Sequence, residues 1–170
     1  MGNIIKVGMA DLNVCKAPDG LTTLGLGSCI GLTLYDPVTK IGGMVHYMLP
    51  DSTKVSNNSN KAKFADTGIE ELLKKVIAAG ASKTRLVAKI AGGAKMFEVS
   101  GLSDVGNIGA RNAEAAKKIL KEKGIRMAVA TSSSPELYEP ALKRNGIYEY
   151  FKAFVTVSEV KRGKGFRKAN

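Results

Sequence analysis

The chain has 170 residues, of which 44% are hydrophobic and 24% are charged, and this composition excludes a disordered chain and a small disulfide-rich protein. Its length fits one domain with a sizeable core. The formal net charge is +11, but +6 of this lies in residues 141–170, so the charge is a weak indication of a nucleic-acid partner for the preceding residues.

Rare residue types narrow the chemistry further. Two cysteines cannot form a disulfide framework, and together with one histidine they are too few for a typical structural zinc site. Residues 1–6 lack the apolar core of a signal peptide, and the chain has no run of about 18 apolar residues that would span a bilayer. We therefore expect a cytoplasmic protein without direct membrane insertion.

The first part of the chain is predicted to be rich in β-structure. Apolar runs separated by turn residues predict short strands at 4–9, 21–24, 32–35 and 41–48. The last two form a hairpin, because residues 36–40 contain Asp36 and Pro37 in a turn pattern. Residues 51–61 are the most polar stretch and are expected to form a mobile loop.

Helical periodicity and further apolar runs alternate in the second part of the chain. They predict helices at 64–79, 107–123 and 135–144, and strands at 84–90, 125–130 and 153–157. Gly80 and Gly124 are natural helix stops. The chain therefore combines a β-rich front with alternating helices and strands behind it.

The glycine-rich stretch at residues 25–31 marks the first candidate site. It contains Cys29, and the only histidine, His46, follows on a neighbouring predicted element. An imidazole beside a thiol takes its proton during attack or holds it as a thiolate–imidazolium pair. Thr23 is placed to orient the imidazole as a third member. Gly27 and Ser28 are expected to support the loop and to offer backbone N–H groups to an oxyanion.

Structural interpretations of these residues remain open beside the catalytic one. Buried free cysteines are common, and a lone histidine on a strand is often a structural residue. Cys15 has no glycine neighbours and no second histidine, so we expect a structural role for it. Ser28 lacks the G-x-S-x-G context of a serine nucleophile, and the glycines do not form a dinucleotide fingerprint.

Two further features concern binding. Phe97, which follows a second glycine-containing loop at residues 91–97, is either an exposed partner-recognition residue or part of the core. The basic stretch at residues 161–168 has one aromatic side chain, Phe166, that would stack on a base. Solvated basic ends are common, so we expect no nucleic-acid partner.

These motifs resemble the chemoreceptor glutamine deamidase family, CheD, of bacterial and archaeal chemotaxis. The resemblance covers about residues 3–129 in the family's order. The matching stretches are Thr23–Cys29, Tyr35–Pro37, Gly42–Ser52, Ala88–Phe97 and Ile108–Asn112.

The resemblance carries expectations for fold and chemistry. It implies an α+β fold of packed β-sheets with helices on the outside, a sandwich similar to cysteine-dependent deamidating toxins. It assigns the nucleophile to Cys29, the base to His46 and an assisting role to Thr23. The implied activity is hydrolysis of glutamine side-chain amides of methyl-accepting chemotaxis receptors to glutamate through a cysteine thioester, without a metal or other cofactor.

The C-terminal part departs from the family pattern. Residues 125–164 instead resemble a segment of haloacid-dehalogenase-type hydrolases, with Thr131, Ser132 and Lys164 at that superfamily's phosphate-binding positions. Its chemistry needs an aspartate nucleophile in a D-x-D motif, which this chain lacks, so we expect no phosphatase activity. We expect a deamidase-like domain at residues 1–130 and a divergent basic segment at 131–170 packed on the same domain.

A second hypothesis from another functional class is a non-catalytic regulator. The resemblance also implies a partner, the chemotaxis phosphatase CheC. In this hypothesis the chain, with its altered C-terminal part, keeps the partner-binding surface and loses catalysis. Phe97 is the predicted partner-binding residue. In this hypothesis the Phe97→Ala change abolishes binding of the CheC-type phosphatase.

Overall fold

The structure is a computed structural model, and it describes residues 2–94, 107–130, 139–140, 143 and 148–155. The chain divides into two compact units, residues 1–125 and residues 126–170. The first unit contains β1 (Ile4–Lys6), β2 (Asp11–Lys16), β3 (Gly20–Thr22), β4 (Ile30–Asp36), β5 (Ile41–Tyr47), α1 (Ala65–Ala78), β6 (Val87–Gly92) and α2 (Ile108–Glu122). Short 3-10 turns lie at Ser52–Lys54, Lys61–Lys63 and Lys83–Arg85.

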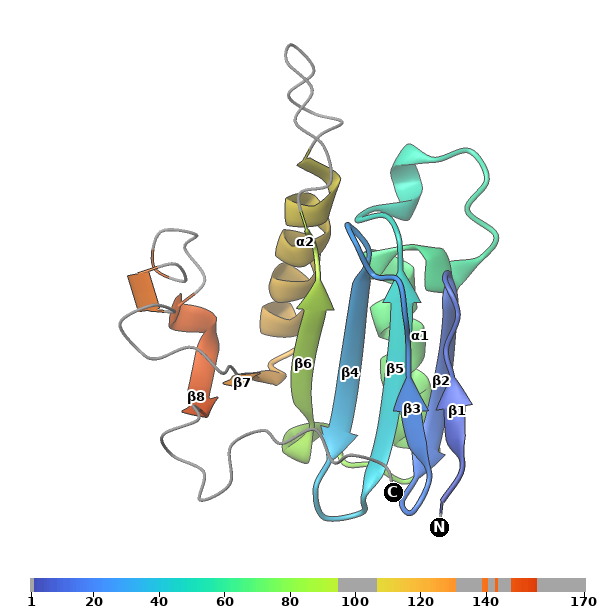
Figure 1. Cartoon of the computed structure of the whole chain (residues 1–170), viewed down its shortest axis with the longest axis vertical. Helices are drawn as coiled ribbons and strands as arrows, with labels where there is room; N and C mark the ends of the chain where they lie inside the picture. The colour runs from blue at the N-terminus through green and yellow to red at the C-terminus, as the bar shows by residue number, and fades with distance from the viewer. Residues whose placement is uncertain (1, 95–106, 131–138, 141–142, 144–147, 156–170) are drawn as a thin grey trace. The chain divides into compact units, whose positions relative to one another are not determined.

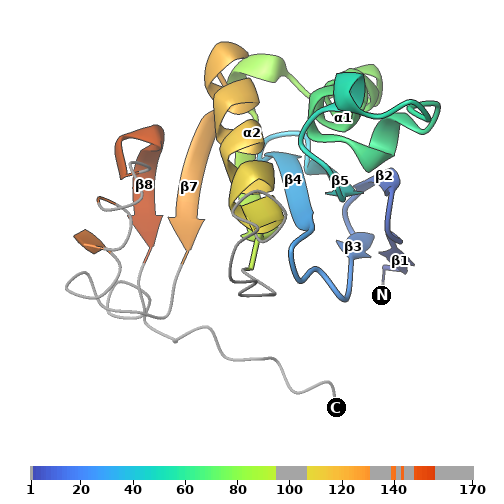
Figure 2. The ribbon, with the colours of Figure 1, turned by 90° about the horizontal axis from the view of Figure 1, so that it is seen from above.

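The core of the first unit is an antiparallel sheet. Its strands follow the order β2-β5-β4-β6, and β1 and β3 form a separate parallel pair (Figure 1). Figure 2 shows α1 and α2 on one face of this sheet and the β1–β3 pair on the opposite face. The predicted α+β class, with sheets packed together and helices outside, is confirmed.

The β4–β5 hairpin forms because Asp36 organises its turn. The Asp36 carboxylate accepts hydrogen bonds from the backbone N–H of Val38 (3.0 Å) and of Ser82 (2.9 Å), and it pairs with Arg85 at 2.7 Å. The Arg85 guanidinium holds the pKa of the buried Asp36 carboxyl well below its usual range. The hairpin predicted from the Asp36-Pro37 pattern is confirmed.

Helix α1 packs closely on β5 because a glycine faces it. Leu72 and Val76 are fully buried, and a Cβ on Gly43 would lie 2.7 Å and 2.5 Å from their side-chain atoms. The helix ends at Ala78, two residues before Gly80, whose φ of +109° favours glycine. The helix predicted at 64–79 is confirmed, but its apolar residue Ile77 lies outside the buried face and is 41% exposed.

The sequence patterns missed one strand, β2. Its residues alternate between exposed and half-buried, and it pairs with β5 alone at the edge of the sheet order. An edge strand with polar residues at Asp11, Asn13 and Lys16 shows little of the apolar signal that predicts a strand. The strand nevertheless sets the position of β5, since Asp11 lies opposite His46 in the ladder.

The second unit contains β7 (Arg126–Ala130) and β8 (Phe151–Val155), which pair in parallel, and a 3-10 turn at Tyr148–Tyr150. Strands were predicted at 125–130 and 153–157, so both overlap the observed ones. Of the helix predicted at 135–144, only residues 139–140 and 143 are described, and these are helical; the rest of it and most of the divergent segment lie outside the described residues.

Candidate active site

The best-defined element of the candidate site is the contact between Thr23 and His46. The Thr23 Oγ1 atom lies 2.8 Å from His46 Nδ1 and 2.8 Å from the carbonyl oxygen of Val7. A carbonyl only accepts, so the single hydroxyl hydrogen of Thr23 goes to Val7, and Nδ1–H of His46 donates to Oγ1. This network assigns the Nδ1–H tautomer and leaves the lone pair on Nε2 as the basic atom of the imidazole.

His46 lies on a central strand of the sheet and is buried. It lies on β5 between Gly31 of β4 and Asp11 of β2, and its side chain is fully buried. Burial lowers the pKa of His46, so the neutral imidazole is the resting form near pH 7. Its Nε2 atom has no hydrogen-bond partner among the described residues. A buried, neutral imidazole with an open Nε2 is competent to accept a proton.

The chain between β3 and β4 covers this histidine. A Cβ on Gly31, the residue opposite His46, would lie 3.3 Å from the Thr23 side chain and 3.2 Å from the Leu26 side chain. Because position 31 has no side chain, the segment that carries Thr23 lies directly over the sheet at this point. The small residue therefore makes the contact between Thr23 and His46 possible.

Cys29 lies immediately before β4 and is partly exposed as a free thiol. Burial raises the pKa of the Cys29 thiol, whereas burial lowers that of His46. These two directions favour a neutral thiol and a neutral imidazole over a preformed thiolate–imidazolium pair. Cys29 precedes the first pair of the β4–β5 register and lies two positions before Gly31, the residue opposite His46; no hydrogen bond joins the described Cys29 and His46 side chains.

Glycines on two loops determine the backbone around Cys29. Gly25 and Gly27 have φ of +70° and +49°, which L side chains rarely adopt. The Cys29 carbonyl accepts from Gly93 N at 2.9 Å, and a Cβ on Gly92 would overlap this carbonyl. The start of the second glycine-containing loop, at Gly92 and Gly93, therefore packs against and hydrogen-bonds to the backbone of Cys29 in the first loop.

The backbone groups expected to bind an oxyanion are partly engaged within this loop. The Cys29 N–H donates to the Leu26 carbonyl at 2.7 Å, and the Gly27 carbonyl accepts from Ala94 N at 2.9 Å. The Ser28 carbonyl accepts from the side chain of Asn112 at 3.0 Å. Gly27 and Ser28 therefore give the loop its shape, while a role for the Cys29 N–H in binding an oxyanion requires its present bond to open.

Asn112 is a residue of this region that the sequence reasoning did not single out. It lies on α2, is fully buried, and donates from Nδ2 to the carbonyls of Ser28 (3.0 Å) and Met48 (2.8 Å). The Tyr47 hydroxyl donates to the backbone carbonyl of Asn112 at 2.7 Å. Its position in the buried stripe of the helix, in line with Ala116 and Leu120, is the sequence signal by which this polar amide could have been found.

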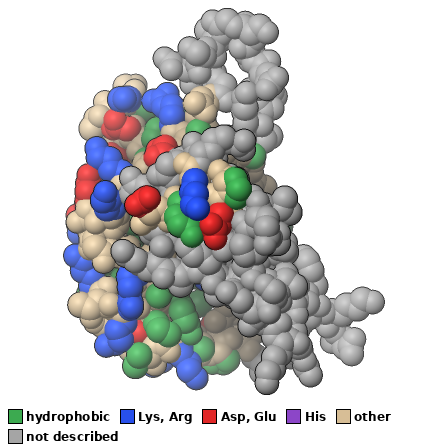
Figure 3. Space-filling model, turned by 90° about the vertical axis from the view of Figure 1, so that its left-hand side faces the viewer, with side chains coloured by type: hydrophobic (Ala, Val, Ile, Leu, Met, Phe, Trp, Pro, Cys, Tyr) green, Lys and Arg blue, Asp and Glu red, His purple; other side chains and the backbone are tan. Residues whose placement is uncertain are grey.

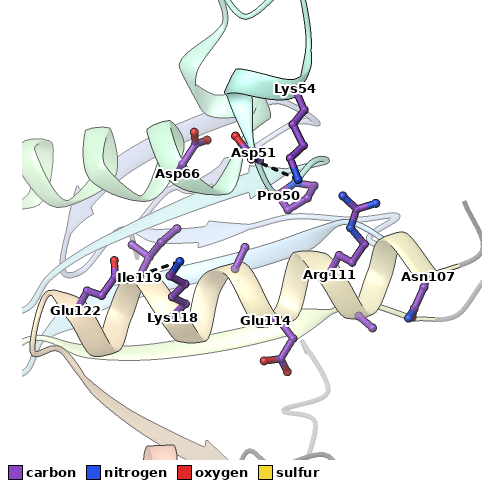
Figure 4. A pocket seen from close by; sticks show the side chains of 12 residues that line it. Pro50, Asp51, Lys54, Asp66, Asn107, Arg111, Glu114, Lys118, Ile119 and Glu122 are labelled. Atoms are coloured by element: carbon purple, nitrogen blue, oxygen red, sulfur yellow. Dashed lines mark ion pairs between the residues drawn. The ribbon is translucent and has the colours of Figure 1, made fainter. Parts of the chain in front are cut away.

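A separate charged groove of about 560 Å³ lies between α2 and the segment after β5 (Figure 4). Its walls carry both signs of charge, with Lys54 paired to Asp51 at 3.8 Å and Lys118 to Glu122 at 4.0 Å. Arg111 extends into it beside Pro50. Neither Cys29 nor His46 lines this groove, so it is distinct from the candidate active site.

The basic side chains of the described residues do not form a uniform patch on the face shown in Figure 3. Lys and Arg side chains of the described residues alternate there with Asp and Glu side chains. Within the part of the chain that the structure describes, there is also no helix with the length and apolarity needed to cross a membrane. Phe97, Thr131, Ser132, Lys164 and Phe166 lie outside the described residues.

Comparison with known proteins identifies the family. The model of the family described as CheD chemotactic sensory transduction matches residues 48–133. A protein of Lachnoclostridium phytofermentans, named a probable chemoreceptor glutamine deamidase CheD, is 52% identical over 155 residues, which cover 86% of this chain and 96% of that relative. The chain belongs to the CheD family.

Other CheD relatives show the same similarity over most of their length. A probable chemoreceptor glutamine deamidase CheD of Caldanaerobacter subterraneus subsp. tengcongensis is 57% identical, over 72% of this chain and 75% of the relative. The chemoreceptor glutamine deamidase CheD of Halalkalibacterium halodurans is 51% identical, over 74% of this chain and 78% of the relative.

A second family model covers the C-terminal part of this CheD chain. The haloacid dehalogenase-like hydrolase model matches residues 109–168 and therefore overlaps the CheD match. The two resemblances noted in the sequence, to CheD and to a haloacid-dehalogenase-type segment, are both confirmed. The described members of the candidate site, Thr23, Cys29, His46 and Asn112, all belong to the first unit.

Proposed function

We propose that this CheD chain is an amide hydrolase that deamidates glutamine side chains of chemotaxis receptors to glutamate. The observation that supports this most is the hydrogen bond between Thr23 and His46, because it leaves Nε2 of a neutral, buried imidazole as the base, on the strand that pairs with the one Cys29 precedes. Relatives named chemoreceptor glutamine deamidase supply the substrate class.

The proposed reaction proceeds through a thioester on Cys29. As the Cys29 sulfur attacks the amide carbon of the glutamine, Nε2 of His46 takes the thiol proton and a tetrahedral intermediate forms. The His46 imidazolium then gives this proton to the leaving nitrogen, and ammonia departs as the carbon–nitrogen bond breaks. A water molecule, deprotonated by His46, attacks the thioester, releases glutamate and restores the thiol. The chain's own residues complete this cycle without a cofactor.

Thr23 has a defined task in this cycle. Each time Nε2 gains a proton, Nδ1–H stays bonded to Thr23 Oγ1, so the imidazolium keeps the same orientation. Gly27 and Ser28 support the loop, and the backbone N–H of Cys29 is the proposed oxyanion donor once it leaves Leu26.

The test is deamidation of a chemoreceptor by matched cysteine variants. A purified receptor signalling domain is incubated with the parent chain, Cys29→Ala or Cys15→Ala, and ammonia release and the amide-to-acid mass change are measured. We expect the Cys29 variant to be inactive and the Cys15 variant to match the parent. Cys15 lies on β2 opposite Gly42 rather than His46, and its thiol donates a hydrogen bond to the backbone carbonyl of Asp19. Equal deamidation by Cys29→Ala would refute the proposal.

We also propose a cytoplasmic location and a CheC-type phosphatase as a partner. Two free cysteines fit a reducing compartment. The partner contact is proposed for Phe97, and titration calorimetry with Phe97→Ala against the parent chain tests it. Unchanged affinity for the phosphatase would contradict this assignment.

A further inference from the structure

We propose that Asn112 is a positioning residue that joins the nucleophile loop to the strand that carries the base. Its kinetic consequence rests on the proposed deamidase function, whereas its structural consequence does not. The two backbone carbonyls that it binds belong to Ser28, which precedes Cys29, and to Met48, which follows His46 by two residues.

The two carbonyls lie where the strand ladder stops. Ile30 of β4 and Tyr47 of β5 form the last pair of the β4–β5 register, so Ser28 and Met48 lie just beyond it. Backbone carbonyls in a buried position need a donor, and at this end of the ladder the facing strand no longer supplies one. The Asn112 amide takes the place of the next rung and binds both strand ends from the side of α2.

The donor half of the Asn112 amide matches this contact, whereas its Oδ1 is buried without a hydrogen-bond partner among the described residues. An amide nitrogen carries two hydrogens, and Nδ2 of Asn112 has two carbonyl acceptors, at 3.0 Å and 2.8 Å. The opposite orientation of the amide would put its oxygen against both carbonyls, so the network determines which atom is nitrogen. Aspartate has the same shape but no hydrogens to donate when ionised.

The helix that carries Asn112 is itself held at this point. Tyr47 follows His46 in the chain, and its hydroxyl donates to the backbone carbonyl of Asn112 at 2.7 Å. One turn earlier, a Cβ on Gly109 would lie 2.6 Å and 2.5 Å from the carbonyl oxygens of Gly93 and Ala94, so α2 packs directly on the loop that binds Cys29 and Gly27. Figure 2 shows α2 lying across the sheet on the same side as α1. Asn112 therefore connects the positions of Cys29 and His46 through a fixed helix.

The test compares Asn112→Asp with Leu120→Ala in the full chain. Leu120 is buried about two turns further along α2, so its truncation weakens the same helix without touching the site. Amide hydrogen exchange at Cys29, Gly93 and Ala94 is measured together with kcat and KM for receptor deamidation. Asn112→Ala, which removes the donor without adding a charge, serves as the second variant if Asn112→Asp does not fold.

We expect both Asn112 variants to lose protection at these amides by on the order of tenfold or more, because the loop opens locally. We expect kcat to fall by about 100-fold with a much smaller change in KM, since the reacting groups lose their relative position. Leu120→Ala is expected to keep both properties while losing stability. Parent-like exchange and kcat in folded Asn112 variants would overturn the proposal. If the Asn112 variants lose protection but the parent chain deamidates no receptor, the positioning role is supported and the proposed function is refuted.

Discussion

At the scale of single residues, the proposed chemistry depends on which nitrogen of His46 carries the proton. The Val7 carbonyl takes the hydroxyl hydrogen of Thr23, and Thr23 in turn accepts from Nδ1–H. Nε2 is left open in a buried position, where the imidazole is neutral. A threonine thus performs the orienting task that a carboxylate performs in many triads, without adding a negative charge that would raise the pKa of the imidazole.

Replacement of Thr23 tests this orienting role. Thr23→Val keeps the shape of the side chain but removes the acceptor for Nδ1–H, so we expect kcat for deamidation to fall by roughly 100-fold through loss of alignment. Thr23→Ser keeps the hydroxyl and is expected to retain most of the activity. If Thr23→Val keeps the parent kcat, Thr23 does not orient His46.

The ionisation state of Cys29 gives a second residue-scale prediction. Burial raises the pKa of its thiol, so alkylation by iodoacetamide in a Cys15→Ala background should increase with pH beyond the ordinary thiol value of about 8.5. The sign follows from the thiolate being the reactive form, which appears only above the raised pKa. A preformed thiolate–imidazolium pair would instead give fast alkylation that is nearly constant between about pH 5 and 8, and this result would contradict the neutral pair.

At the scale of elements, glycines allow the close approaches that build the site. The absence of a side chain at Gly31 lets the Thr23 segment lie over β4. The absence of one at Gly92 leaves room for the Cys29 carbonyl, and at Gly43 for the packing of α1 on β5. The side chains of the strand that carries His46 therefore face packed elements on both sides of the sheet. Such approaches make the position of the imidazole sensitive to added volume.

The approach at Gly43 has a measurable energetic consequence. Gly43→Ala places a methyl group against the buried Leu72 and Val76, and we expect it to lower the free energy of unfolding by about 1–3 kcal/mol. Gly8→Ala is the matched control, because a Cβ there would meet nothing within 4 Å. Urea unfolding of both variants tests the difference. Equal stability of the two would show that α1 adjusts freely.

The elements also show how far sequence reasoning reaches. The β4–β5 hairpin and the glycine-rich loop around Cys29 were predictable, because Asp36-Pro37 and the glycines act on the backbone next to them. Strand β2 was not, since a half-exposed edge strand gains its structure from pairing with β5. Thr23 and His46 were identified as candidates, but the Val7 carbonyl that determines the tautomer and the Asn112 amide reach the site through tertiary contacts that no local pattern contains.

At the scale of the whole molecule, the candidate chemistry and the charge excess occupy different parts of the chain. Thr23, Cys29, His46 and Asn112 belong to residues 1–125, whereas more than half of the net charge of +11 lies in residues 141–170. The CheD match and the haloacid dehalogenase-like match divide in a similar way along the chain, with an overlap at residues 109–133. The net charge therefore says little about the substrate of the proposed deamidase.

The most direct test of the central claim is to trap the covalent intermediate on the intact protein. The chain is mixed with a receptor-derived glutamine peptide, quenched in acid during turnover, and examined by mass spectrometry and peptide mapping. We expect an adduct whose mass equals that of the peptide minus ammonia, located on Cys29 and absent from Cys29→Ala. An adduct on Cys15 or Ser28, or turnover without any adduct on Cys29, would contradict it.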